Sequence, residues 1–281
     1  MDKLRPLMLN VGFAEQNADW NWKNVNSPFM RLYYVTEGNA QVILPNGTQP
    51  LKAGHLYCIP AFTTHSYRCT SRFCHYYIHL YEAPQQTASL LDEWELPSEV
   101  PASEQDLQLV RRLCDINPQM SLESPDPTYY DFATALKQNF TQNKKRKLCD
   151  QIESYGIVYQ LLARFIRDAR PKTPSKDERI VKALTYIRDH LYEPIGLNSL
   201  IQNACLSKDH FIRLFKKETG LTPVRYIHQK KIEKAQLILL TDNIPIKSIA
   251  YSLAFDDYSY FIRVFKKVTG TTPQAYRNAR P

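Results

Sequence analysis

Apolar and polar residues follow two different periods along this chain. Residues 30–83 contain short runs rich in β-forming residues, such as MRLYYVTEG and FCHYYIHLY, which are separated by turns including Asn46-Gly47. From residue 103 onward, apolar residues recur at the three- and four-residue spacing of helices. The pattern therefore predicts an N-terminal β-barrel or sandwich with flanking helices, followed by an all-helical region.

Three helices are predicted between the strands and residue 170. Residues 103–116 begin with a Ser N-cap, residues 128–140 are helix-forming, and residues 148–169 form a long helix. The basic run at 144–147 is interpreted as a solvated loop. In the long helix, apolar residues repeat at alternating spacings of four and three, which is a heptad pattern. This seam predicts a homodimer contact made by Leu148, Ile152, Tyr155, Tyr159 and Leu162. The alternative is a single helix packed on the barrel.

A thirteen-residue stretch occurs twice near the C-terminal end. Residues 211–223 read FIRLFKKETGLTP and residues 261–273 read FIRVFKKVTGTTP, with ten identical positions. Gly220 and Gly270 are expected helix ends, and the Thr-Pro that follows each starts another helix. A short amphipathic helix precedes each copy, at 197–207 and 246–257. The repeat therefore predicts two helix-turn-helix motifs.

The faces of the repeated helices differ in polarity. Phe211 and Phe261 lie on the side expected to face the core, and the opposite side of each helix is polar. Solvated charge on two ordinary surface helices is one explanation. The residues on this outer side are Lys208, Asp209, Ile212, Arg213 and Lys216 in the first copy and Tyr258, Ser259, Ile262, Arg263 and Lys266 in the second.

Charge is concentrated in the same region. Residues 1–170 hold 17 basic and 18 acidic residues, whereas residues 171–281 hold 19 basic and 10 acidic residues. The polar, Pro-containing stretch 171–178 is the expected linker between domains 1–170 and 179–281. A basic domain attached to a neutral one indicates a polyanionic partner for the basic half. We expect double-stranded DNA rather than a membrane, because neither repeated helix has an apolar outer face.

Several other classes are disfavoured by what the sequence lacks. It has no apolar run of eighteen residues, and its start has no long apolar region of a secretory signal. Six cysteines without metal-type spacing are expected to be reduced thiols in a cytoplasmic protein. No Walker loop, dinucleotide fingerprint or Ser-His-Asp arrangement is present, so neither a cofactor nor an enzymatic activity is expected.

The second repeat resembles the signature of AraC/XylS transcription regulators. The shared pattern is I-x-x-I-A-x-x-x-A-F-x-D-x-S-Y-F-x-R-x-F-K-K-x-x-G-x-T-P-x-x-Y-R, and the resemblance covers roughly the last hundred residues. Ala254, and Cys205 in the first motif, stand where the family usually has Gly in the turn. The resemblance implies a DNA-binding regulator of α+β fold, with a cupin-like N-terminal barrel, a C-terminal double helix-turn-helix domain, a homodimer and contact with RNA polymerase.

The outer faces of the two helices contain residues expected to contact DNA bases and others expected to contact phosphates. Arg213 and Arg263 occupy equivalent positions, and Arg pairs bidentately with guanine in the major groove. The resemblance places further base contacts at Lys208, Asp209, Ile212, Tyr258, Ser259 and Ile262. Lys216, Lys217, Lys266 and Lys267 lie one turn further on and are expected to contact phosphates. The alternative is that both Arg side chains only pair with Asp209 or Asp257.

The spacing of the two motifs fits two successive grooves. A helix of ~19 residues, from Thr222-Pro223 to Thr241, would span ~28 Å at about 1.5 Å per residue. The helical repeat that separates successive major grooves on one face of DNA is ~34 Å. One polypeptide could therefore place a helix in each of two adjacent grooves.

The barrel is expected to hold a small polar effector. From Gly54 the sequence follows a cupin pattern, with Pro60, His65 and Phe62 at a position where Gly is common. Relatives with sugar effectors use positions like Glu37, Tyr67, His75 and Tyr77, and His65 and His79 lie in the same phase. Alternatively, the opposite phase faces inward, with Leu32, Val35, Ile78 and Leu80.

Two other functions compete with this one. The barrel could be only a dimerisation scaffold, or it could be a metal-dependent cupin enzyme with His65, His75 and His79 as ligands. The His-x-His followed by Glu of metal cupins is missing between residues 31 and 55, so no metal is expected. The effector, the operator sequence and the sign of regulation are left open by the sequence.

Overall fold

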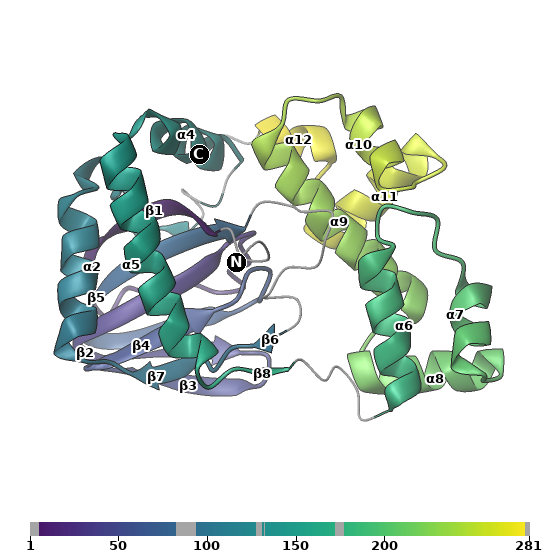
Figure 1. The fold of residues 1–281 in the computed structure, drawn as a ribbon, viewed down its shortest axis with the longest axis horizontal. Helices are drawn as coiled ribbons and strands as arrows, with labels where there is room; N and C mark the ends of the chain where they lie inside the picture. Colours follow the sequence, from purple (N-terminus) through teal and green to yellow (C-terminus); the bar gives the residue numbers. More distant parts are fainter. Residues whose placement is uncertain (1–5, 83–93, 128–130, 132, 172–176, 279–281) are drawn as a thin grey trace. The chain divides into compact units, whose positions relative to one another are not determined.

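The structure is a computed structural model that describes residues 6–82, 94–127, 131, 133–171 and 177–278 (Figure 1). It divides into two compact units. The first contains residues 6–82 and 95–170, and the second contains Trp94, Pro171 and residues 177–278. The predicted two-domain α+β fold class is confirmed, with strands in the first unit and helices in the second.

The first unit is built on one antiparallel sheet. Its strands are β1 (Pro6–Gln16), β2 (Met30–Leu44), β3 (Gly47–Lys52), β4 (His55–Ile59), β5 (Ser66–Glu82) and β7 (Glu99–Pro101). The order is β1-β5-β2-β4-β7, and β3 pairs with β2. Among the described residues β1 and β7 remain at the two ends, so the cupin-like sheet is open and not a closed barrel. Strands β6 (Trp94–Glu95) and β8 (Arg170–Pro171) form a separate small sheet.

The turn residues explain the connections of this sheet. The β2–β3 hairpin closes over Pro45 and Asn46, where the Asn-Gly signal predicted a turn. Gly54 and Phe62 both have positive φ, at 76° and 58°. The unusual left-handed conformation of Phe62 explains why Gly is common at this position in the pattern.

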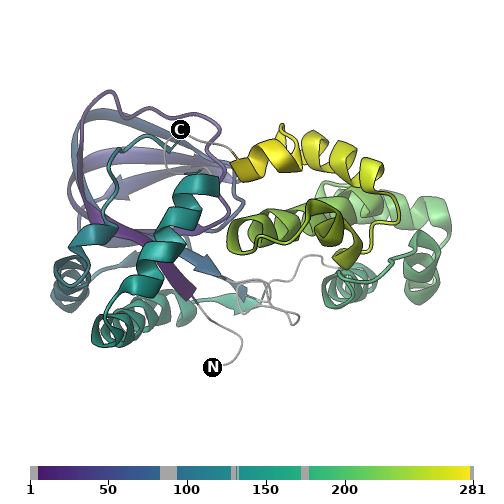
Figure 2. The ribbon, with the colours of Figure 1, turned by 90° about the horizontal axis from the view of Figure 1, so that it is seen from above.

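Helices cover one face of the sheet (Figures 1 and 2). Helices α2 (Glu104–Asp115) and α5 (Leu148–Ile166) pack on each other, and η1 (Pro118–Met120) and α4 (Ala133–Lys145) lie against β1. Ser103 is the N-cap of α2, as the sequence predicted, and it forms a capping box with Asp106. The residues of α4 overlap the helix expected over 128–140, although 128–130 and 132 lie outside the described residues.

Both phases of the long strands are buried. Tyr33, Val35 and Tyr77 belong to a cluster on one side of the sheet, and Leu32 and Ile78 are also almost fully buried. The alternative in which Leu32 and Val35 share a face is therefore wrong, since Val35 lies with Tyr33. Residues of both faces of this sheet are therefore buried, and the side that holds the cluster with Tyr33 and Tyr77 is called the inner side below.

The second unit is all-helical. It consists of α6 (Glu178–Asp189), α7 (Leu197–Ala204), α8 (Lys208–Thr219), α9 (Pro223–Thr241), α10 (Ile246–Ser252), α11 (Tyr258–Thr269) and α12 (Pro273–Asn278). Two separate cores form around the repeats. Phe211 and Phe215 anchor the first, and Phe261 and Phe265 anchor the second. Helix α9 contributes Ile227 to the first core and Ile232 to the second, so it joins the two motifs.

Candidate functional site

Both helix-turn-helix motifs have the predicted local geometry. The turn residues Cys205 and Ala254 adopt left-handed conformations, each with φ of 52°. Gly220 and Gly270 end α8 and α11 in the same conformation. A side chain at a left-handed position costs roughly 1–2 kcal/mol, which explains the family preference for Gly in this turn. The chain tolerates this strain at both motifs without changing the helix arrangement.

The polar faces of α8 and α11 are open to solvent. Their apolar counterparts Phe211 and Phe261 are fully buried, which fixes the rotation of each helix. The candidate residues are all exposed or half-exposed within the unit. They are Lys208, Asp209, Ile212, Arg213, Lys216 and Lys217 on α8, and Tyr258, Ser259, Ile262, Arg263, Lys266 and Lys267 on α11.

The two Arg side chains are not held by acidic residues. Among the ion pairs of the described residues, none contains Arg213 or Arg263. Asp257 instead caps α11, where its carboxylate accepts a hydrogen bond from the Tyr260 amide. The Arg263 guanidinium lies 5.7 Å from the centre of the Tyr260 ring. Both guanidinium groups therefore retain donors for an external acceptor.

A cavity of about 180 Å³ opens on the inner side of the sheet. Three of the residues expected to bind an effector, His75, Tyr77 and His79, line it, together with Tyr33. The sequence did not indicate the remaining lining residues, which come from other parts of the fold: Phe13, Ala14, Glu15, Gln16, Trp20, Leu122 and Pro125. No local sequence pattern identifies these residues, because β1, the loop after it and the segment after η1 come together only when the chain folds.

Two other expected residues lie behind the cavity wall. The Tyr67 hydroxyl is 2.6 Å from the Tyr33 hydroxyl and 2.8 Å from His65 Nε2. The ring of Tyr67 also stacks on Trp20, with centroids 4.3 Å apart. His65 and Tyr67 are therefore buried supports of Tyr33 and Trp20, which do line the cavity.

Glu37 requires a correction, because it does not face the cavity. The pairing of β2 with β5 shifts between Val35 and Glu37, which marks a β-bulge. A bulge adds one residue and so moves the following side chains to the other face. Glu37 is exposed and pairs with Arg72, with Oε1 2.9 Å from Nη1.

The imidazoles around the cavity are neutral near neutral pH. Burial lowers the pKa of His75 to about 3 and that of His65 to about 4. Burial also lowers the pKa of His79, with a contribution from the positive charge of Arg31. His75 Nδ1 is buried and has no hydrogen-bond partner among the described residues. The cavity thus offers aromatic rings and uncharged hydrogen-bonding groups, together with the Glu15 carboxylate, which already pairs with Arg72. This lining suits an uncharged polar molecule.

The segment after α2 covers part of the cavity. The Leu122 amide donates a hydrogen bond of 2.7 Å to the Tyr77 hydroxyl. Further along, Asp131 accepts hydrogen bonds from Ser27 and from Arg31, whose Nη2 lies 3.3 Å from both carboxylate oxygens. Arg31 is almost completely buried, so this ion pair lies out of water and joins Asp131 to β2.

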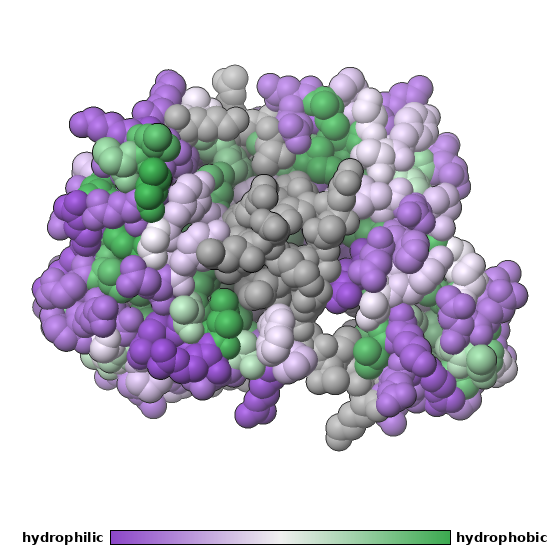
Figure 3. All heavy atoms as spheres, viewed as in Figure 1, coloured by the Kyte–Doolittle hydropathy of each residue, from purple (hydrophilic) through white to green (hydrophobic). Residues whose placement is uncertain are grey.

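Helix α5 has the predicted apolar edge at its start. Leu148 is 71% exposed, Ile152 is 62% exposed and Tyr155 is 38% exposed. Apolar side chains gather over this end of α5 at the upper left of Figure 3. Leu162 requires a correction, because it is 1% exposed and already belongs to the core of its own chain. The seam available to a partner is therefore confined to the first half of α5, with Tyr159 half-exposed at its limit.

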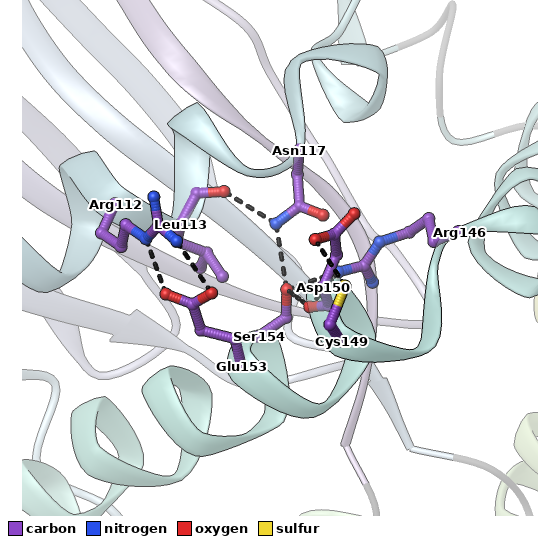
Figure 4. Close-up of polar contacts among 8 residues, drawn as sticks. All are labelled: Arg112, Leu113, Asn117, Arg146, Cys149, Asp150, Glu153 and Ser154. Atoms are coloured by element: carbon purple, nitrogen blue, oxygen red, sulfur yellow. Dashed lines mark hydrogen bonds and ion pairs between the residues drawn. The ribbon is translucent and has the colours of Figure 1, made fainter.

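The basic run at 144–147 requires a correction, because it is not the solvated loop that the sequence suggested. Helix α4 continues to Lys145, and Arg146 is buried. The Arg146 guanidinium donates to Ser154 and, at 2.8 Å, to the Asp150 carbonyl oxygen (Figure 4). Ser154 Oγ also accepts a hydrogen bond of 3.0 Å from Asn117. Arg146 therefore holds the first turns of α5 in place.

No group of three His, Cys, Asp or Glu side chains in the described ranges is arranged to hold a metal ion. No described helix combines the length and apolar character needed to cross a bilayer.

Comparisons with known proteins connect the helical unit to DNA-binding proteins. Residues 200–279 match the family described as helix-turn-helix domain. The arabinose operon regulatory protein of Escherichia coli K12 is 36% identical over 112 residues, which are 39% of this chain and 38% of that protein. The transcriptional activator Btr of Bacillus subtilis is 26% identical over 253 residues, which are 90% of this chain and 45% of Btr.

A solved structure extends over both units. Fatty-acid-bound ToxT from Vibrio cholerae is 13% identical, covers 97% of this chain and 94% of ToxT, and has a TM-score of 0.47. The chain spans less than half the length of the curated relatives it matches.

Proposed function

We propose that this chain, whose C-terminal domain belongs to the AraC/XylS family, is a sequence-specific DNA-binding transcription regulator. One observation carries the proposal. Helices α8 and α11 present the same Arg-x-x-Lys-Lys face to solvent, and Phe211 and Phe261 bury the opposite face. The excess of 19 basic over 10 acidic residues in 171–281 supports a polyanionic partner for this domain. Residues 1–170 act as the sensing and dimerisation domain, 171–178 as the linker and 179–281 as the DNA-binding domain.

The roles of the exposed residues follow from their chemistry. Arg213 and Arg263 read guanine edges, because a guanidinium pairs with both O6 and N7. Lys208, Asp209 and Ile212 on α8 complete the first set of base contacts, and Tyr258, Ser259 and Ile262 on α11 complete the second. Lys216, Lys217, Lys266 and Lys267 contact phosphates, which position the protein without reading sequence.

Helix α9 separates α8 and α11, the two helices proposed to contact bases. It has 19 residues and therefore spans ~28 Å at about 1.5 Å per residue. Successive major grooves on one face of DNA lie ~34 Å apart. This length supports the binding of α8 and α11 in adjacent grooves of one duplex.

Salt dependence of DNA binding tests the proposal. The chain should select a consensus from random duplex DNA, and Lys266→Ala should weaken binding to all sequences alike. The slope of log affinity against log salt should fall by about one phosphate contact. Lys182→Ala, at an exposed position on α6, is the matched control and should leave the slope unchanged. Failure of the wild-type protein to enrich any sequence would contradict the proposal.

The N-terminal cavity supports control by a small uncharged polar molecule, a sugar among the candidates. Tyr77 and His75 would bind it, and Trp20 would stack on its apolar face. A thermal-shift screen of carbohydrates and other metabolites should find a stabilising compound, because a ligand raises the melting temperature by mass action. Its effect should disappear in Tyr77→Phe and His75→Ala. A hit that binds both variants unchanged would place the ligand elsewhere, and no hit would favour a scaffold role.

The exposed edge of α5 supports a homodimer. A cytoplasmic location and contact with RNA polymerase are part of the proposal only because the resemblance to AraC/XylS regulators implies them. Leu148 and Ile152 would be buried against the partner chain, with Tyr155 and Tyr159 beside them. Leu148→Asp combined with Ile152→Asp should give monomers in sedimentation, and Val224→Asp, at an exposed apolar position of α9, is the control. A double variant that stays dimeric would contradict this interface.

A further inference from the structure

Lys231 lies at the point where the two helix-turn-helix cores meet. It belongs to the middle of α9, between Ile227 of the first core and Ile232 of the second. Lys231 is 4% exposed, unlike its neighbour Lys230, whose side chain reaches the surface and pairs with Glu233 at 2.8 Å. A buried lysine is uncommon unless nearby acceptors form hydrogen bonds with its ammonium group.

The acceptors of Lys231 come from the segment before the first motif and from the turn of the second. Its Nζ donates to the Glu193 carbonyl oxygen at 3.1 Å and to the Ala254 carbonyl oxygen at 3.3 Å. Glu193 lies between α6 and α7, immediately before the first motif, and Ala254 is the left-handed turn residue of the second. The Phe255 ring centre is 5.6 Å from Nζ. One side chain therefore ties the entrance of the first motif to the turn of the second.

Packing alone does not require an amine at this position. A methionine has a similar stem and would fill the same space without the cost of burying a charge. That cost is real here, because burial lowers the pKa of Lys231 to about 8. In exchange, the Lys231 ammonium donates to two backbone carbonyls at once, that of Glu193 before the first motif and that of Ala254 in the second.

We propose that Lys231 is a positioning residue that sets the rotation and separation of α8 and α11. It thereby determines how many base pairs must lie between the two DNA segments that these helices read. This inference rests on the proposed function. Without the shared donor, the motifs are still linked by α9 but are free to turn about the join between the two cores.

The experiment measures spacing preference and not only affinity. The wild-type consensus is selected first, and duplexes are then made with one or two base pairs inserted or deleted between its halves. Such a change displaces one half-site, so wild type should lose ~10-fold or more in affinity with each altered spacing. Lys231→Met should reduce this penalty to less than threefold while its affinity for the original spacing falls. Lys231→Arg, which keeps donors at the same place, should restore a preference of at least half the wild-type ratio.

Controls separate the possible failures. Lys230→Met removes an adjacent lysine charge at the surface and should keep the wild-type spacing profile. If Lys231→Met does not fold, Lys231→Gln provides the same comparison, because its shorter side chain can reach only one carbonyl. An equal loss of affinity at every spacing in the Met or Gln variant would overturn the inference and leave the proposed function intact. Failure of wild type to select any consensus would instead contradict the proposed function.

Discussion

The two helix-turn-helix motifs share a backbone design but differ in the contacts that hold their outer faces. In both, the turn residue has φ of 52° and two Phe residues anchor the second helix in a core. Asp257 caps α11 through the Tyr260 amide, whereas Ser207 makes no side-chain hydrogen bond at the start of α8. Tyr260 also lies under Arg263, and its equivalent in the first motif is His210. The residues that the two motifs share determine the fold. Those that differ determine how rigidly α8 and α11 are held.

The largest expected effect tests the shared part of this comparison. Phe211→Ala and Phe261→Ala each remove a fully buried ring, so each should lower the local unfolding free energy by about 3–5 kcal/mol. Hydrogen exchange of peptides from α8 and α11 is the suitable measurement, because all three tryptophans, at 20, 22 and 94, precede these helices. Val268→Ala, at a 42% exposed position, is the control and should change exchange little. A large effect at only one motif would show that the cores are not equivalent.

A smaller effect tests the difference between the motifs. Asp257→Ala should lower the opening free energy of α11 by about 1 kcal/mol, because it removes the N-cap hydrogen bond. Ser207→Ala should have a clearly smaller effect on α8, since no side-chain cap bond is lost. The same exchange experiment compares them. Equal destabilisation of both helices would mean that the second motif is not held more rigidly at its start.

The smallest expected effect concerns the strained turns. Cys205→Gly and Ala254→Gly should each stabilise their motif by about 0.5–1 kcal/mol, because relief of left-handed strain exceeds the added chain entropy of Gly. Protection of the flanking helices should rise by the same amount in both variants. Unchanged or lower protection would show that the side chains at these turns make compensating contacts.

Most of the helical unit was predictable from the sequence because its signals are local. Gly220 and Gly270 end helices, Thr-Pro begins them, and Phe residues at helical spacing identify the buried face. Each of these signals occurs in both copies of the repeat, which strengthened the prediction. Such patterns depend on neighbours within a few residues, so tertiary contacts rarely override them.

The cavity was harder to predict because its geometry is non-local. A single extra residue at the bulge after Val35 turned Glu37 outward, and strict alternation cannot show where a strand inserts a bulge. Trp20 and Leu122 reach the cavity from separate segments of the chain. Leu162 was expected in the dimer seam and Arg146 in a solvated loop, and only the packing of α5 showed that both are buried. Lys231 was missed because a lysine in a basic run resembles a solvated charge.

The central claim is that two equivalent helices read two separate DNA segments through Arg213 and Arg263. Selection of binding sites from random duplex DNA with wild type, Arg213→Ala and Arg263→Ala tests it most directly. Each variant should lose preference at a different half of the wild-type consensus, since a bidentate Arg–guanine pair contributes roughly 1–3 kcal/mol of discrimination. Identical consensus sequences for all three proteins would contradict the claim, even if the variants bound more weakly.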